Sequence, residues 1–138
     1  MTSLPSVNYL SVLVAGIAIF IVGGLWYSPV LFAKRWVALM GKSEDDIKKA
    51  APGALPFVIV FLCALATAYA LAVVLNHFGP VTLTRTLLIA VLLWIGFTGA
   101  TSFGSATFSG TPRALWLINS GYNLVSFIVA ALILAFWR

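Results

Sequence analysis

Hydroxyl side chains recur at spacings of three and four residues along the apolar segment that covers residues 83–104. This set, which lies within or just beyond the segment, comprises Thr98, Thr101, Ser102 and Ser105. A row of hydroxyls on one side of a helix could line the path of a small polar solute. The same hydroxyls could instead bond carbonyls one turn back in their own helix and let other helices approach, and we favour this interpretation.

A second polar set, Asn119, Tyr122 and Asn123, lies in the apolar segment 114–137. Asn119 and Asn123 are one helical turn apart, and Asn123 lies about 15 Å along the helix axis from Arg113, near mid-membrane. A carboxamide at that depth must face protein or water, because leaving it in lipid costs several kcal/mol. We expect a hydrogen bond between helices there, with contact to a ligand or ion as the alternative.

The residues that usually carry catalysis or bind metals are few and scattered. The carboxylates are confined to positions 44–46, and the single histidine and cysteine, His77 and Cys63, lie about 21 Å apart along one expected helix. A Cys–His pair, a zinc-spaced set and an intrachain disulfide are therefore not expected. We predict no enzymatic activity and no cofactor or metal, and we expect Cys63 to be a buried, unreactive thiol.

Composition indicates a membrane protein. Hydrophobic residues make up 62% of the 138-residue chain and charged residues 8%, against about half and about a quarter in soluble domains. Because small domains bury the smallest fraction of their surface, lipid must cover the excess. The net charge of +5 comes from a few dispersed cations, which suit anionic lipid headgroups and not nucleic acid.

Four apolar segments, at about residues 7–27, 56–76, 83–104 and 114–137, are long enough to cross the membrane. A span needs about 20 residues, and without water to satisfy its backbone each must be a helix. The sequence predicts one all-α transmembrane domain of four helices over residues 1–138. Short joins make the second and third spans, and the third and fourth, antiparallel neighbours.

The connection over residues 28–55 is expected to hold two short helices. Phe32, Trp36, Leu39 and Met40 recur on one helical face with Lys34 off it, the pattern of an amphipathic helix lying at the membrane surface. The sequence SEDDIKKAAPG then predicts a helix with Ser43 as its N-cap and acidic residues in its first turn.

The corner segment GGLWYSPVLFAKRW (residues 23–36) has the composition of a membrane interface. Aromatic side chains favour headgroup level, a proline permits a turn, and long cationic side chains reach lipid phosphates. The interface anchors that we predict are Trp26, Tyr27, Pro29, Lys34, Arg35 and Trp36.

The distribution of cations predicts the orientation. Lys34, Arg35, Lys42, Lys48, Lys49 and Arg113 fall on one side of the expected membrane, and Arg85 and Arg138 fall on the other. Because cytoplasmic loops are enriched in Lys and Arg, residues 28–55 should be cytoplasmic and both termini extracytoplasmic, in a plasma (inner) membrane.

Gly96, Ala100 and Gly104 form a ridge of small residues spaced four apart in the third span. In lipid, close backbone contact supplies much of the energy of helix association. The ridge could receive a helix of the same chain or of a second copy. We expect a homo-oligomer.

The chain resembles a known family through its corner segment. The residues that carry the likeness are Gly23, Trp26, Tyr27, Ser28, Pro29, Phe32, Lys34 and Trp36. They are similar to the first-helix signature of a family of small bacterial membrane proteins, domain of unknown function 1761 (DUF1761), and three further spans follow in the expected places. The resemblance implies a four-span membrane protein and implies no activity.

Two functions are consistent with these features. The leading hypothesis is a structural or accessory membrane protein that acts through self-association or a partner complex. The alternative is a channel or carrier for a small neutral or anionic solute, formed only as an oligomer because four helices pack around side chains and leave no lumen.

Overall fold

The computed structural model describes residues 3–138, which form helices and connecting turns without any strand. The helices are α1 Tyr9–Trp26, α2 Ala33–Met40, α3 Glu44–Ala50, α4 Leu55–His77, α5 Leu83–Leu93, the π-helical η1 Trp94–Gly99, α6 Ala100–Ser109 and α7 Arg113–Phe136. Four stretches are long and apolar enough to cross a membrane, namely α1, α4, the continuous stretch Leu83–Ser109, and α7. The predicted all-α class with four spans is confirmed.

Side-chain caps explain where several helices begin. The Asn8 side chain accepts hydrogen bonds from the backbone N–H of Leu10 and Ser11 at the start of α1. Ser43 accepts one from Asp46 at 3.1 Å, as predicted for α3. These acceptors satisfy N–H groups that the first helical turn leaves without partners.

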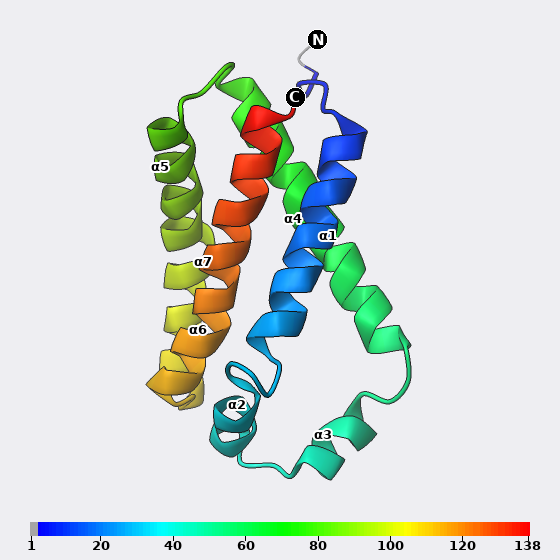
Figure 1. The fold of residues 1–138 in the computed structure, drawn as a ribbon. Helices are drawn as coiled ribbons and strands as arrows, with labels where there is room; N and C mark the ends of the chain where they lie inside the picture. Colours follow the sequence, from blue (N-terminus) through cyan, green and yellow to red (C-terminus); the bar gives the residue numbers. More distant parts are fainter. Residues whose placement is uncertain (1–2) are drawn as a thin grey trace.

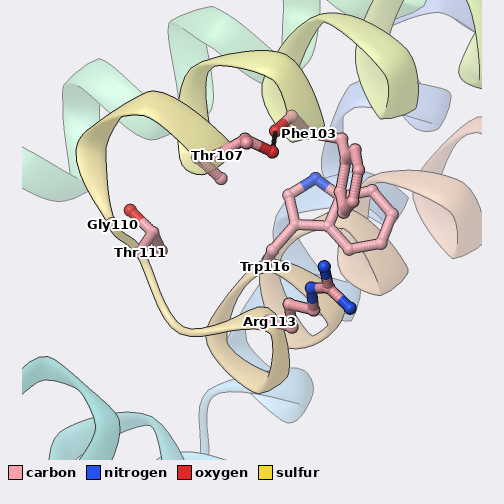
Figure 2. A pocket seen from close by; sticks show the side chains of 7 residues that line it. Phe103, Thr107, Gly110, Thr111, Arg113 and Trp116 are labelled. Carbon is pink, nitrogen blue, oxygen red and sulfur yellow. Dashed lines mark hydrogen bonds between the residues drawn. The ribbon is translucent and has the colours of Figure 1, made fainter.

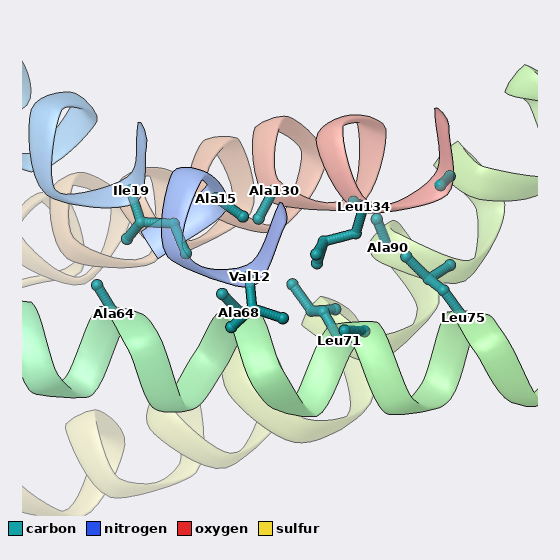
Figure 3. Packing of buried hydrophobic residues seen from close by; sticks show 13 residues of the cluster. Val12, Ala15, Ile19, Ala64, Ala68, Leu71, Leu75, Ala90, Ala130 and Leu134 are labelled. Carbon is teal, nitrogen blue, oxygen red and sulfur yellow. The ribbon is translucent and has the colours of Figure 1, made fainter. Parts of the chain in front are cut away.

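Helix α7 lies at the centre of the bundle (Figure 1). It packs against α1 and α4 on one side and against α5, η1 and α6 on the other, and α1 also packs against α4. The core between these helices is built largely from small side chains, and Ala15, Ala68 and Ala130 are fully buried (Figure 3). Small residues let helix backbones approach closely, which is how helices associate in lipid.

The two ends of the bundle are distinct (Figure 1). The connection 28–55 and the α6–α7 turn lie at one end, and the two described termini and the α4–α5 turn lie at the other. At the terminal end, Asn76 donates to the carbonyl oxygen of Ser6 at 2.7 Å, and Arg138 donates to those of Leu75 and Gly79. A cation that caps the carbonyl end of α4 also suits the helix dipole.

The third span departs from the regular helix that the sequence predicts over residues 83–104. It continues to Ser109 and widens into the π-helical turn η1 at its middle. A Cβ added to Gly99 would lie 3.2 Å from the carbonyl oxygen of Trp94 and 3.4 Å from its ring. The wide turn therefore depends on a glycine beside a large indole, which a count of apolar residues does not register.

Helix α2 carries apolar and basic side chains that differ in exposure. Trp36 and the preceding residue Phe32 are half-buried while Lys34 and Arg35 are exposed, and α2 packs against α7. Its cytoplasmic placement stays a prediction.

Cys63 was expected to be buried but is exposed, because α4 packs on α1 and α7 along one face and leaves its other faces open.

A close contact between α1 and α4 yields a stability prediction. A Cβ on Gly16 would lie 2.6 Å from Cδ2 of Leu65 and 3.4 Å from its Cα. We expect Gly16→Leu to overpack this contact and lower the free energy of unfolding by about 1–3 kcal/mol, measured by melting in detergent. Ala66→Leu, at an exposed alanine of α4, is the control, and equal melting of the two variants would contradict the contact.

Candidate functional site: the polar belt around α7

The corner segment attaches α1 to α7 through two hydrogen bonds. Trp26 donates its indole N–H to the carbonyl oxygen of Ile118 at 2.8 Å, and Tyr27 donates its hydroxyl to Oδ1 of Asn119 at 2.7 Å. Consecutive residues at the end of α1 thus bond consecutive residues of α7. The remaining lone pair of a helical carbonyl can accept such a bond without breaking the helix.

Two glycines make room for the aromatic side chains. A Cβ on Gly121 would lie 3.0 Å from Cζ2 of Trp26, and a Cβ on Gly23 would lie 3.2 Å from Cε1 of Tyr122. Each helix therefore offers a glycine to an aromatic residue of the other. The Tyr27 and Tyr122 rings then meet edge to face, with 5.6 Å between centroids.

The predicted interface anchors divide into two groups. The polar atoms of Trp26 and Tyr27 bond α7 inside the protein, and the placement of their rings at headgroup level stays a prediction. The Trp36 ring lies 5.7 Å from that of Tyr27, so α2 is held against the end of α1. Lys34 and Arg35 remain exposed, and Pro29 lies in the turn between α1 and α2, as the corner prediction requires.

On the opposite side of α7, two tryptophans and two serines form a small network. Trp94 of η1 donates to the carbonyl oxygen of Ser120 at 2.9 Å, and Trp116 donates to Oγ of Ser102 at 2.9 Å. Ser102 lies 2.6 Å from the carbonyl oxygen of Thr98 and 3.3 Å from Oγ of Ser120. When Ser102 donates its one proton to Thr98, its oxygen accepts from Trp116 and Ser120, and every member is satisfied.

The structure separates the two polar sets identified in the sequence. Asn119 bonds α1, whereas Ser102 bonds the other face of α7 through Ser120 and Trp116. Thr101 bonds its own helix, 3.0 Å from the carbonyl oxygen of Phe97, and Ser105 is exposed. The hydroxyl row and the asparagines therefore do not line one shared path within the protomer.

Two neutral polar side chains of α7, those of Asn123 and Ser126, have no hydrogen-bond partner among residues 3–138. The Ser126 hydroxyl is buried without one, and half-buried Asn123 takes part in no side-chain hydrogen bond there. Asn123 is thus the mid-span carboxamide that the protomer leaves open. Of the two asparagines, Asn119 makes an interhelical hydrogen bond.

Sequence reasoning missed Trp94, Trp116 and Ser120. An available signal was the indole N–H, which requires an acceptor when it is buried in an apolar segment. What the sequence does not reveal is which carbonyl or hydroxyl provides that acceptor, because the choice depends on helix rotation.

A small pocket lies at the α6–α7 turn (Figure 2). Its volume is about 190 Å³, and its walls include Phe103, Thr107, Thr111, Arg113 and Trp116. The Phe103 and Trp116 rings pack edge to face at 4.9 Å, and the Thr107 hydroxyl bonds the Phe103 carbonyl oxygen. With one cation and no carboxylate or thiol, the pocket holds no acid–base pair or nucleophile–base pair.

We call the interhelical hydrogen bonds on both sides of α7 the polar belt. All its side chains are neutral, namely those of Trp26, Tyr27, Trp94, Ser102, Trp116, Asn119 and Ser120. Across residues 3–138, no group of three or more His, Cys, Asp or Glu side chains could hold a metal ion. What the belt can do chemically is fix the rotation and depth of the helices on both sides of α7.

The Tyr27–Asn119 bond can be measured by a double-mutant cycle. We expect Tyr27→Phe and Asn119→Leu each to lower the melting temperature in detergent, with a coupling free energy of about 0.6–1.7 kcal/mol, the size of interhelical hydrogen bonds in membranes. Tyr69→Phe, at an exposed tyrosine of α4, is the control for loss of a phenol. Strictly additive effects would show that the bond contributes nothing.

Comparison with known proteins places the chain in a family. Neither a curated protein nor a solved structure matches it. The model of one family, described as "Protein of unknown function (DUF1761)", matches residues 10–135, which is nearly the whole chain. The match includes the corner segment, the polar belt and all four spans, and it confirms the resemblance drawn from the corner residues. The protein is a member of the DUF1761 family.

Proposed function

We propose that this protein is a structural or accessory membrane protein that acts by associating within the membrane, first with copies of itself. The observation that carries the proposal is that the polar belt joins helices within the protomer. Oδ1 of Asn119 and the hydroxyls of Ser102 and Ser120 have hydrogen-bond partners there. These hydrogen bonds hold helices together and leave few polar groups available to bind a solute.

The exposed side of the third span supports association. Gly96, Ala100 and Gly104 are all exposed, and nothing lies within 4 Å of a Cβ built on either glycine. The ridge therefore does not receive a helix of the same chain, which was one of the two possibilities. A second protomer can approach it closely, and close backbone contact favours association in lipid.

Asn123 adds a second reason. Its carboxamide lies near mid-span without a partner in the protomer, and hydrocarbon cannot satisfy it. A neighbouring protein can supply the missing hydrogen bond. In a bilayer such bonds contribute about 0.6 kcal/mol on average, enough to favour one contact face over another.

The alternative function is a channel or carrier for a small neutral or anionic solute, and Asn123 is the observation that favours it. A polar path would need Asn123 together with third-span hydroxyls contributed by another protomer, because within one protomer Ser102 and Asn119 face different helices. Both functions thus require assembly.

Association is tested by measuring mass in native lipid. Protein extracted in polymer-bounded native discs should have the mass of an oligomer, and Ala100→Leu should shift it toward monomer because the larger side chain separates the helices. The matched control is Ala66→Leu, at an exposed alanine of α4, which should leave both mass and melting unchanged.

The same preparations distinguish the alternatives. If wild type and Ala100→Leu are both monomeric, association through the ridge is excluded. If reconstituted wild type conducts a solute and Asn123→Leu abolishes that flux without changing mass or melting, the channel or carrier hypothesis replaces the accessory one.

The proposal includes a place in a plasma membrane, with residues 28–55 cytoplasmic. Single cysteines at exposed positions on opposite ends, Ala51→Cys and Pro80→Cys in a Cys63→Ala background, report the orientation. In intact cells, a membrane-impermeant thiol reagent should label position 80 and not position 51, because the cation-rich end is retained in the cytoplasm. Labelling of position 51 alone would reverse the orientation.

A further inference from the structure

A cleft between α1, α4 and α7 is not explained by the polar belt. Its volume is about 450 Å³, and its walls include Gly23 and Gly24 of α1 and Phe57 and Val60 of α4. A Cβ built on Gly24 meets no atom within 4 Å. The volume is within the range of about 300–1,000 Å³ that is typical of small-molecule sites.

The cleft arises because α1 and α4 diverge. The helices are in close contact at Gly16 and Leu65, and one turn further on the Phe20 and Phe61 rings meet edge to face at 5.8 Å. Beyond that contact, α4 leads away from α1 toward its connection with α3 (Figure 1). The cleft is therefore closed at Phe20 and open toward the end where the corner segment lies.

The walls of the cleft are suited to hydrocarbon. Phe20, Phe57 and Val60 are apolar, and two tyrosines, Tyr27 and Tyr122, also line the cleft. The Tyr27 hydroxyl donates a hydrogen bond to Asn119. The Tyr122 hydroxyl donates a long one, of 3.4 Å, to the carbonyl oxygen of Ile19. Because the polar atoms are engaged inside the bundle, a polar solute would lose its hydration there without replacement.

Unpaired positive charge lies next to the open end. Tyr27, a wall residue, packs against Trp36, which places α2 beside the mouth of the cleft. Lys34 and Arg35 are exposed on α2, and no acidic residue occurs before Glu44. Basic groups at the membrane surface beside a pocket between helices attract anionic headgroups.

We propose that the cleft binds one acyl chain of an anionic phospholipid, whose headgroup phosphate is held by Lys34 and Arg35. The aromatic and aliphatic walls take the chain, and the two cations select the headgroup. A partner helix does not fit this volume, since a helix with its side chains is about 10 Å across. The site is on the opposite side of α7 from the ridge, so it stands independently of self-association.

The test uses the full-length protein, delipidated and incubated with equal amounts of phosphatidylglycerol and phosphatidylcholine. Native mass spectrometry should detect one retained lipid per chain, mainly phosphatidylglycerol. Gly24→Leu should abolish retention because its side chain fills the cleft, whereas Ala66→Leu, at an exposed alanine of α4 that does not line the cleft, should retain lipid as wild type does. Val60→Trp fills the cleft from the opposite wall and replaces Gly24→Leu if that variant melts early.

The cations are tested separately from the cleft. Lys34→Gln combined with Arg35→Gln should lower the ratio of phosphatidylglycerol to phosphatidylcholine by about tenfold while one lipid is still retained. Equal retention by Gly24→Leu, Val60→Trp and wild type would overturn the cleft as the site. An unchanged ratio in the double variant would overturn the role of the cations. If wild type retains a polypeptide instead of a lipid and the cleft variants lose it, that polypeptide would replace the lipid as the occupant.

Discussion

The absence of water in the bilayer interior is the constraint on which the structure depends. Every polar group that enters the hydrocarbon region needs a partner inside the protein, or it costs several kcal/mol. The chain meets this constraint at α7, where indole and phenol donors from two directions reach consecutive residues of one helix. Trp26 bonds Ile118, Tyr27 bonds Asn119 and Trp94 bonds Ser120. The helix rotations are thereby fixed, because turning α7 would break bonds on both sides.

Close packing and hydrogen bonding support one another in this arrangement. Lipid solvates apolar side chains as well as protein does, so helices gain little from apolar contact alone and rely on close approach. Buried alanines bring α1, α4 and α7 together, and Gly121 lets the Trp26 ring lie against α7. Only at that distance can the indole N–H reach a backbone carbonyl. A larger side chain at Gly121 would displace both the ring and its hydrogen bond.

Sequence reasoning succeeded where a local rule is sufficient. Run length and hydropathy predicted four spans, and Ser43 with Asp46 predicted the start of α3, because these features depend on neighbours along the chain. It failed where the outcome depends on which helix faces which. Nothing local to Trp26 or Tyr27 identifies Ile118 or Asn119 as the hydrogen-bond partner. The π turn at Gly99 depends on where the Trp94 ring lies, and the exposure of Cys63 depends on how few helices cover α4.

The use of interior polar groups to join helices leaves the open features of the protein at its surface. Since Asn119, Ser102 and Ser120 are used to join helices, the features that remain open lie at the periphery of the bundle. They are the exposed ridge on the third span, the half-buried carboxamide of Asn123, and the cleft beside the corner segment. Within residues 3–138, the ridge receives no helix, Asn123 has no hydrogen-bond partner, and no side chain fills the cleft. These open features, and not the hydrogen bonds that join the helices, are where contacts with lipid or with another protein can form.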